Sequence, residues 1–311
     1  MTGIFGALTS VIGSPTHMLL ILIAVPVGMF FGAIPGLGGK LGIVLAIPFV
    51  FGMDPLAGAI FLISMHSVVH TGGAIPSILF GVPGTGPDAA TVVDGLPMTR
   101  NGEAGRAIGA ALGASGVGGV IGGLFLIAVM PLLRPIVLAF GPSEFFFLAL
   151  FGIMFIALLA GDSLVKGLIV GLFGLMVAFI NLDPQTGAQR YTFDFLFLWD
   201  GIDIITAVLG IFALPEMIAL GATGGSISQV QKRATYGISE VLKGVGDVFI
   251  HWSLTIRTSV IGAFIGMIPG LGGDAASWIC YGHAVQSSKT PERFGKGAVE
   301  GVIAPETANN S

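Results

Sequence analysis

Residues 32–42 read GAIPGLGGKLG and residues 266–276 read GMIPGLGGDAA, so the chain contains the hexapeptide IPGLGG twice. Each copy follows an apolar run long enough to form a helix. Proline ends such a helix, and the glycines leave backbone N–H and C=O groups uncovered. A bare kink or a packing point explains a single copy equally well. The repetition instead favours two breaks that present backbone groups to one ligand.

The composition predicts an integral membrane protein. The chain has 311 residues, of which 54% are hydrophobic and only 10% are charged, and its mean hydropathy is +0.94. Soluble domains have about 25% charged residues. A net charge of −4 without a basic block argues against nucleic-acid binding. The single Cys280 excludes an internal disulfide framework, and the uncharged N-terminal stretch indicates no removable signal peptide.

Several segments approach the roughly 20 apolar residues that a spanning helix needs. The expected spans are 17–34, 104–133, 143–160, 164–181, 202–221 and 250–268. Arg257 interrupts the last of these spans. Glycines recur every fourth residue at 105, 109 and 113, a spacing that allows helices to pack closely in lipid.

Residues 35–103 are apolar but interrupted by seven prolines. The runs 41–51 and 56–70 are each too short to cross a bilayer upright. Short apolar segments broken by glycine and proline are typical of discontinuous or re-entrant helices. The stretch 72–95 is expected to enter the membrane as a hairpin and turn back.

Loop charges predict the orientation in the membrane. Segment 183–203 carries four aspartates against one arginine, whereas segment 222–247 carries Lys232, Arg233 and Lys243. Positive residues favour the cytoplasmic side, so we expect 222–247 to be cytoplasmic and 183–203 to be external. The same rule places 94–106, with Arg100 and Arg106, on the cytoplasmic side.

Irregular backbone survives in lipid only where protein or a wet cavity satisfies its polar groups. Two breakers in corresponding places therefore predict two related, inverted halves that face one site at the membrane midplane. We expect residues 1–222 to hold the first repeat with the helices that follow it. Residues 223–311 are then a cytoplasmic linker and the start of a second, incomplete repeat.

The stretch 72–95 adds oxygen groups to this expected site. Ser77, Thr85 and Thr91 carry hydroxyls, and Asp88 and Asp94 carry carboxylates. Freed carbonyls with such oxygens suit Na⁺, whereas N–H groups and hydroxyls suit a substrate carboxylate. An ordinary loop outside the membrane is the alternative, and it fits 94–103 better than 83–91.

Two histidines, His66 and His70, stand four residues apart on one face of a possible helix. They suit a metal pair, a proton relay or the polar lining of a cavity. The sequence contains no P-loop, no G-x-S-x-G elbow and no H-E-x-x-H zinc motif. We therefore expect binding chemistry and no enzyme activity.

The chain resembles the large membrane subunit of the tripartite tricarboxylate transporters, the TctA family. The resemblance rests on motifs spread in family order over nearly the whole chain. They are both IPGLGG copies, HTGGAIPSILFGVPGTGPDAATVVDG at 70–95, GEAGRAIGAA at 102–111, LDPQTGAQRYTF at 182–193, DGIDIITAVLGIFALPE at 200–216 and FGKGAVEGVIAPETANN at 294–310.

The resemblance implies a multi-pass permease of the bacterial inner membrane. Such a permease imports small carboxylates such as citrate by symport with an ion. Its implied partners are a small four-helix membrane subunit and a periplasmic substrate-binding protein. The motif positions carried over as the site are Gly36, Gly38, Gly39, Pro83, Gly84, Thr85, Thr91, Gly270, Gly272, Gly273, Glu306, Thr307, Asn309 and Asn310.

Two departures from the family pattern affect these expectations. His70 stands where the family often has an aromatic residue, so this chain can have a different pocket or coupling ion from other members of the family. The chain also stops inside the second motif block, so we expect it to insert in the membrane without transporting by itself.

The sequence thus predicts an all-α polytopic secondary transporter with no cofactor besides a coupling ion, Na⁺ or H⁺. A carboxylate substrate brings negative charge into low dielectric, and Lys40 is the one basic residue beside the motifs. Asp88, Asp274 and Glu306 are the candidates for a cation site, although each suits an exposed helix cap as well. The alternatives are a carrier that needs no binding protein and, less consistent with the motifs, an intramembrane enzyme.

Overall fold

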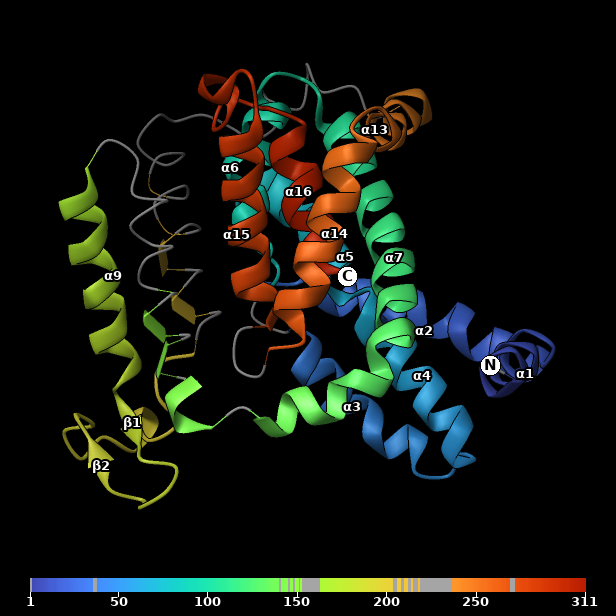
Figure 1. Cartoon of the computed structure of the whole chain (residues 1–311), viewed down its shortest axis with the longest axis horizontal. Coiled ribbons are helices and arrows are strands. Elements are labelled where there is room, and N and C mark those ends of the chain that lie inside the picture. The colour runs from blue at the N-terminus through green and yellow to red at the C-terminus, as the bar shows by residue number, and fades with distance from the viewer. Residues whose placement is uncertain are drawn as a thin grey trace.

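The computed structural model describes residues 2–35, 38–139, 163–203, 237–268 and 272–311, with scattered positions within 141–152 and 206–218. These parts are almost entirely helical (Figure 1). The helices are α1 (Thr2–Ile12), α2 (Pro15–Ala33), α3 (Gly38–Val50), α4 (Pro55–Ser67), α5 (Val69–Phe80), α6 (Ala89–Arg100), α7 (Ala104–Ala139), α9 (Leu164–Ala178), α13 (Ile238–Ile250), α14 (Trp252–Gly266), α15 (Gly272–Ser287) and α16 (Glu300–Asn309). Two 3₁₀ turns and one antiparallel pair of short strands complete them: η1 (Leu196–Leu198), η3 (Pro291–Arg293), β1 (Asn181–Leu182) and β2 (Gln189–Arg190).

In the described part of the chain, three helical segments are long and apolar enough to cross a membrane. They are Pro15–Ala33, Pro55–Phe80 and Ala104–Pro131. Helices α13 and α14, bent by 77° at a short break, make a fourth if they are counted as one span. The all-α membrane class is therefore confirmed, as are the expected spans at 17–34 and 104–133. The expected span at 250–268 coincides with α14.

Two boundary predictions were wrong. The run 56–70 does not stop short, because α4 and α5 follow each other as one apolar stretch of 26 residues. Val68 joins them in a helical conformation and donates its N–H to the His66 carbonyl, so the helix hardly breaks. Conversely, α9 has only 15 residues, since the chain turns into β1 at Asn181. Most of the spans expected at 143–160 and 202–221 lies outside the described residues.

Helix starts follow the capping chemistry of the sequence. Asp54 Oδ2 accepts hydrogen bonds from the N–H groups of Leu56 and Ala57, and Pro55 takes the first helical position of α4. Asp183 makes the same kind of contact in a turn between β1 and β2. The N–H groups of Thr186 and Gln185 donate to it and lower the pKa of this partly exposed carboxylate.

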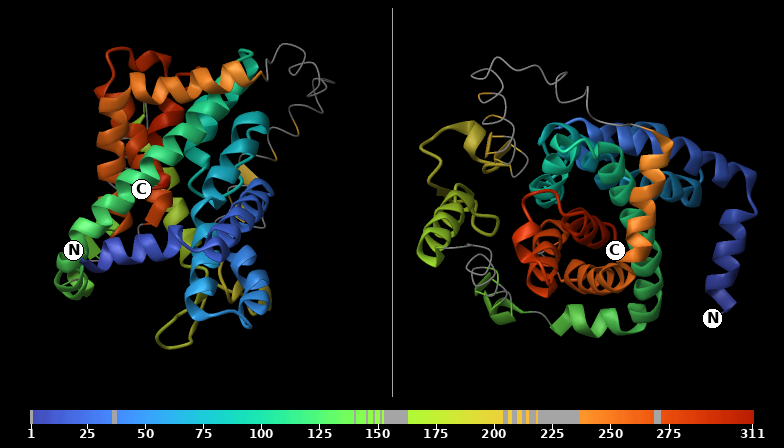
Figure 2. Two further views of the ribbon diagram at one scale, coloured as in Figure 1. Left: turned by 90° about the vertical axis from the view of Figure 1, so that its right-hand side faces the viewer. Right: turned by 90° about the horizontal axis from the view of Figure 1, so that it is seen from above.

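Helix α16 occupies the centre of one group of helices. It packs against α6, α7, α14 and α15, while α2 packs against α4 and α5 beside them. Figure 2 shows the C-terminal end of α16 in the middle of the molecule, seen from above. The same view shows α9 with β1 and β2 to one side, and none of the residues of α9 is buried.

The glycines spaced by four residues on α7 serve helix packing, as their spacing predicted. Gly109 lies against the backbone of Val241 on α13, and Gly113 lies against Val245 and Val248. The two helices are also joined by an ion pair between Arg106 and Asp247, in which Nε lies 2.6 Å from Oδ2. Helix α13 therefore crosses α7 closely at one end of the molecule (Figure 1).

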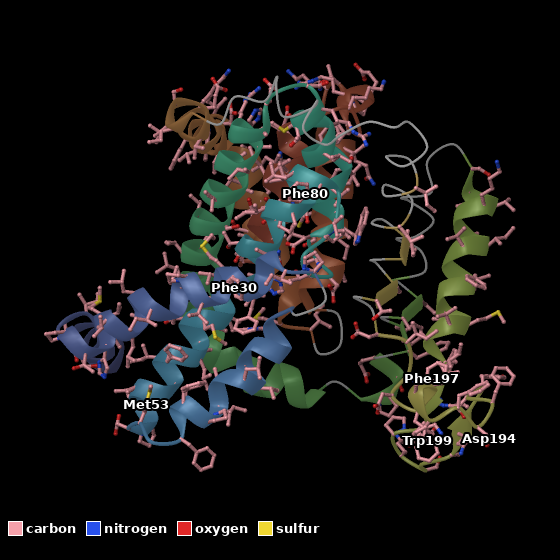
Figure 3. The ribbon with its side chains drawn as sticks, turned by 180° about the vertical axis from the view of Figure 1, so that it is seen from behind. Phe30, Met53, Phe80, Asp194, Phe197 and Trp199 are labelled. Atoms are coloured by element: carbon pink, nitrogen blue, oxygen red, sulfur yellow. The ribbon has the colours of Figure 1, made fainter. Side chains whose placement is uncertain are left out.

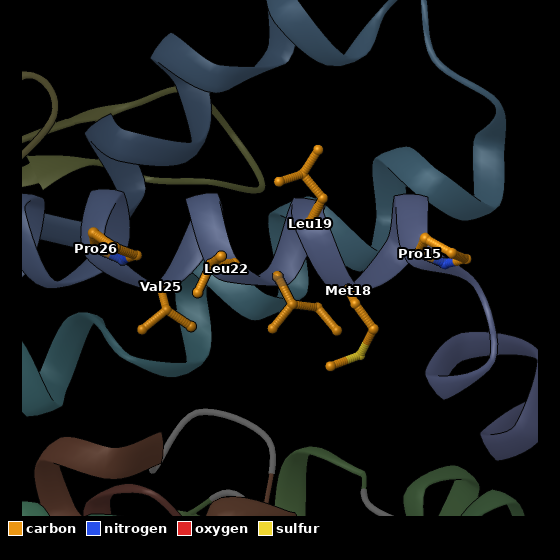
Figure 4. A pocket seen from close by; sticks show the side chains of 7 residues that line it. Pro15, Met18, Leu19, Leu22, Val25 and Pro26 are labelled. Atoms are coloured by element: carbon orange, nitrogen blue, oxygen red, sulfur yellow. The ribbon is translucent and has the colours of Figure 1, made fainter.

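The outer surface is rich in exposed apolar side chains. Among them are Phe30 and Phe80 on the helices, and Phe197 and Trp199 in the segment after β2 (Figure 3). A groove of about 620 Å³ runs along α2 between Pro15 and Pro26. Its lining is wholly apolar (Figure 4). Such surfaces suit contact with lipid chains and offer nothing to a charged substrate.

Candidate functional site

The segment 81–88 between α5 and α6 is irregular backbone buried inside the helices. Every residue from 83 to 92 is buried. The segment returns alongside α5, because the N–H of Gly84 donates to the carbonyl of Gly73, at 3.3 Å. Helix α6 then runs beside α5, where the hydroxyl of Thr99 donates to the carbonyl of Ile78. The predicted break in 72–95 is therefore present, but it begins after Phe80, and Gly72 and Gly73 lie within helix α5.

Glycine is required where this segment touches its neighbours. A Cβ on Gly84 would overlap the carbonyl oxygen of Gly32 and the backbone of Gly73. A Cβ on Gly73 would overlap the carboxylate of Asp88. The end of α2, the middle of α5 and the irregular segment thus meet with backbone against backbone, which no larger residue permits.

Asp88 is fully buried at the point where the irregular segment becomes α6. Its Oδ2 accepts hydrogen bonds from the N–H and the hydroxyl of Thr85, at 2.8 and 2.7 Å. Its Oδ1 accepts a longer hydrogen bond from Asn309 Nδ2, at 3.4 Å. The carboxylate therefore links the first motif region to the end of α16.

Glu306 on α16 is the second fully buried carboxylate. The hydroxyl of Thr91 donates to Oε1 at 2.5 Å, and the hydroxyl of Ser115 donates to Oε2 at 3.3 Å. Asn310 Nδ2 donates to Ser115 Oγ and to the carbonyl oxygen of Glu306. We name as the carboxylate cluster the residues Thr85, Asp88, Thr91, Ser115, Glu306, Asn309 and Asn310.

The last two glycines of the second IPGLGG copy, Gly272 and Gly273, adjoin this cluster. Helix α15 begins at Gly272, the same glycine of the IPGLGG motif as Gly38, at which α3 begins. A Cβ on Gly86 would overlap the carboxylate of Asp274, so the first turn of α15 lies against the irregular segment. The carboxylates of Glu306 and Asp274 both interact electrostatically with Asp88.

Most residues expected at the site are brought together. Pro83, Gly84, Thr85 and Asp88 lie in the irregular segment. Thr91 and the residues 306–310 adjoin it through the hydrogen bonds above, and Gly273 and Asp274 pack beside it. Thr307 lies in the same turn of α16, but its hydroxyl bonds its own helix at the carbonyl of Ile303.

The remaining expected residues are not placed in the cluster. Gly38 and Gly39 open α3, a helix that packs against α2, α4 and α5. Gly36 and Gly270 lie outside the described residues. The two IPGLGG copies were predicted to meet at one site. The structure describes only part of each copy and the helices beside them, so the meeting itself lies outside the described residues.

Sequence reasoning missed two residues of the polar centre. Ser115 lies in a glycine- and alanine-rich stretch of α7, where nothing marks it apart from other small residues. Thr71 on α5 donates to Asn310 Oδ1 at 3.4 Å. Only the packing of α5, α7 and α16 around one point reveals their role.

Asp94, considered as a second carboxylate of the site, is an anchor of the fold. Its Oδ1 accepts hydrogen bonds from the N–H groups of Gly297 and Ala298, each at 2.9 Å. Its Oδ2 accepts the hydroxyl of Tyr281 at 3.0 Å. The contacts with Gly297 and Ala298 fix the chain that leads into α16, which carries Glu306, and the contact with Tyr281 ties Asp94 to α15.

The charges of the cluster are negative and lack a basic partner among the ion pairs of the described residues. Those pairs join Arg106 to Glu103 and Asp247, Arg190 to Asp183, and Arg293 to Glu300. In the same part of the chain, no three His, Cys, Asp or Glu side chains group as metal ligands. A cation held here would therefore need hydroxyl, amide or backbone oxygens beside the carboxylates.

Broken helices around a buried polar centre are typical of secondary transporters. Residues 18–311 match the family model described as the tripartite tricarboxylate transporter TctA family. The chain belongs to this family, as the motifs indicated. The description of the family names a tripartite transporter of tricarboxylates.

Two curated relatives come from Agrobacterium vitis. An uncharacterized 52.8 kDa protein in the TAR-I ttuC' 3' region is 31% identical over 301 residues, which cover 96% of this chain and 59% of the relative. An uncharacterized protein in the TAR-II ttuC' 3' region is 46% identical over 50 residues, 16% of this chain and 21% of the relative. The present chain thus spans about three fifths of the longer match. No solved structure matches the chain.

Proposed function

We propose that this chain is part of the permease of a secondary transporter that imports small di- or tricarboxylates across the bacterial inner membrane. The observation that carries the proposal is the pair of buried carboxylates, Asp88 and Glu306, between broken helices in a chain of this family. The chemistry is binding and alternating access, with no covalent step.

The polar centre supplies two kinds of group for such a substrate. Helices α6 and α15 begin beside it, and a helix N-terminus carries roughly half a positive charge. The hydroxyls of Thr85 and Thr91 and the amide of Asn309 can donate to substrate oxygens after rearrangement. These groups offset part of the substrate's charge and leave the rest uncompensated.

A co-transported cation supplies the missing charge. Bringing a citrate-like anion beside Asp88 and Glu306 places several negative charges in low dielectric, where unpaired charge is very costly. We propose that Na⁺ or H⁺ enters with the substrate and that Asp88, Asp274 and Glu306 contribute to its site. The partners in this proposal are a small four-helix membrane subunit and a periplasmic protein that delivers the carboxylate.

Uptake by the reconstituted transporter tests this function. The complete permease would be placed in proteoliposomes with its partner subunits and given radiolabelled citrate or tricarballylate under a Na⁺ or pH gradient. We expect accumulation that stops when the gradient is collapsed. Uptake without any binding protein would indicate a different kind of carrier, and hydrolysis of a substrate would favour an enzyme.

A further inference from the structure

His66, His70, Thr85 and Asp88 form a row that leads from the exposed face of α4 to a buried carboxylate. The rings of His66 and His70 lie 6.0 Å apart between centroids. His70 Nδ1 lies 2.9 Å from Thr85 Oγ1, and that hydroxyl lies 2.7 Å from Asp88 Oδ2. Solvent exposure of the side chains falls along the row: His66 is exposed, His70 is half-buried and Asp88 is fully buried.

The hydrogen bonds of this row allow two complementary arrangements of hydrogens. With Asp88 ionised, Thr85 donates to the carboxylate and accepts from a protonated Nδ1 of His70. With Asp88 protonated at Oδ2, the acid donates its hydrogen to the Thr85 hydroxyl. That hydroxyl in turn donates to an unprotonated Nδ1 of His70. Both contacts persist in both states, because a hydroxyl donates one hydrogen and accepts another. The heavy atoms therefore need not move when the proton does.

The outer end of the row lies near the middle of a helical segment that is long and apolar enough to cross a membrane. His66 is exposed close to the centre of the apolar run Pro55–Phe80. Ionisable residues at such a depth face a water-filled cavity or the protein interior, because lipid cannot solvate them. His66 and the neighbouring Ser67 are both exposed, so this side of α4 offers polar groups to water or to a covering protein segment.

We propose that His66, His70 and Thr85 form a proton path between that water and the carboxylate of Asp88. In the inward step, imidazolium at His70 breaks its Nδ1–H bond and gives the proton to Thr85 Oγ1. The Thr85 hydroxyl proton passes at the same time to Asp88 Oδ2. The step leaves a neutral imidazole protonated at Nε2, an intact hydroxyl and a neutral acid. This path rests on the proposed function only in making H⁺ the coupling ion.

Other groups around the path determine how it responds to pH. His66 on α4 faces His70, and Asp274 on α15 and Glu306 on α16 face Asp88. Helices α6 and α7 approach with the hydroxyls of Thr91 and Ser115, which bind Glu306. Helix α2 approaches with the backbone of Gly32 beside Gly84. Asp274 and Glu306 therefore place two further acidic groups beside the inner end of the path.

Time-resolved infrared spectroscopy after a light-triggered pH drop tests the path without substrate. The carbonyl band of protonated Asp88 would be assigned by its loss in Asp88→Asn. We expect this band to form about 100-fold more slowly in His70→Phe, the size of effect that a positioned proton carrier supplies. The pair Thr85→Val and Thr85→Ser separates the hydroxyl from packing, since only valine should slow the band. His17→Phe, a histidine of α2 bonded to Ser10, is the matched control.

An Asp88 band that forms at the wild-type rate in both His70→Phe and Thr85→Val would overturn the proposal. A band that is absent at every pH would overturn it as well. Because no carboxylate substrate is present, failure of citrate uptake would count against the proposed function and leave this measurement unaffected.

Discussion

The hydroxyl of Thr91 on α6 donates a hydrogen bond of 2.5 Å to Oε1 of Glu306 on α16, although the two residues are 215 positions apart in the chain. Both side chains are fully buried. This contact joins the two regions that the motifs predicted to form one site. It also gives the buried carboxylate one of its hydroxyl donors, the other being Ser115.

Thr91→Val should therefore destabilise the protein. The variant keeps the shape of the side chain but leaves Glu306 with one donor fewer, which costs about 1–3 kcal/mol. Thermal unfolding of the purified protein in detergent measures the loss. Thr91→Ser should lose much less. Thr258→Val is the matched control, because that buried hydroxyl bonds only carbonyls of its own helix. Equal losses in Thr91→Val and Thr258→Val would contradict the assignment.

Gly84→Ala should damage the fold at the centre of the site. Its methyl group would meet the backbone of Gly32 and Gly73, neither of which can move aside without shifting a helix. Overpacking of this kind costs about 1–3 kcal/mol or more. The control is Gly174→Ala on α9, where a Cβ meets nothing within 4 Å and should add about 0.5–1 kcal/mol of stability. The same unfolding assay would refute the close contact if both variants were stabilised.

Replacing one partner of the Arg106–Asp247 ion pair should destabilise the protein more than replacing both partners together. The side chains are 23% and 7% exposed, and two hydrogen bonds join them. Removing one partner, as in Asp247→Leu, should cost up to about 3 kcal/mol because the other charge is left partly buried. The double variant Arg106→Met with Asp247→Leu should be nearer to wild type than Asp247→Leu alone. Arg293→Ala, which breaks a more exposed pair, should cost below about 1 kcal/mol. A double variant worse than the sum of its singles would contradict this reasoning.

Cysteine labelling should place Gln189 and Lys243 on opposite sides of the membrane. Both positions are exposed. Figure 1 shows β2 and α13, which carry them, at opposite ends of the molecule. We expect Gln189→Cys to react with an impermeant maleimide in intact cells, and Lys243→Cys to react only after permeabilisation. The native Cys280 is buried and should stay unlabelled. Reaction of Lys243→Cys from outside would reverse the proposed orientation.

The sequence grouped side chains that the fold brings into contact, whereas it misplaced some of the helix boundaries around them. Thr91 and Glu306 were expected from motif positions and Asp88 as a carboxylate suited to a cation. Hydrogen bonds join Thr91 to Glu306 and Asp88 to Asn309. Helix ends were harder to predict, because they depend on the conformation of the residues that follow each helix. Val68 stays helical and prolongs α4 into α5, and α5 runs on to Phe80, well into the stretch 72–95 that was expected to turn back.

The partners within the site could not be predicted from local patterns. Ser115 and Thr71 contribute because α5 and α7 approach α16 at their level, and neither helix carries a local signal of that approach. Asp94 illustrates the converse. Its position in the motif suited a ligand-binding carboxylate, but the N–H groups of Gly297 and Ala298 occupy it from across the fold.

The coupling of substrate and cation at the carboxylate cluster is tested most directly by citrate affinity. Calorimetry on the complete transporter would measure it against Na⁺ at fixed pH, and then against pH without Na⁺. We predict that affinity rises with Na⁺ or with falling pH, by about 5–150-fold, the usual range for coupled sites. Asp88→Asn should remove most of that dependence, whereas Asp183→Asn in the exposed turn should retain it. Affinity that stays flat in both titrations would contradict ion coupling and leave a facilitated carrier.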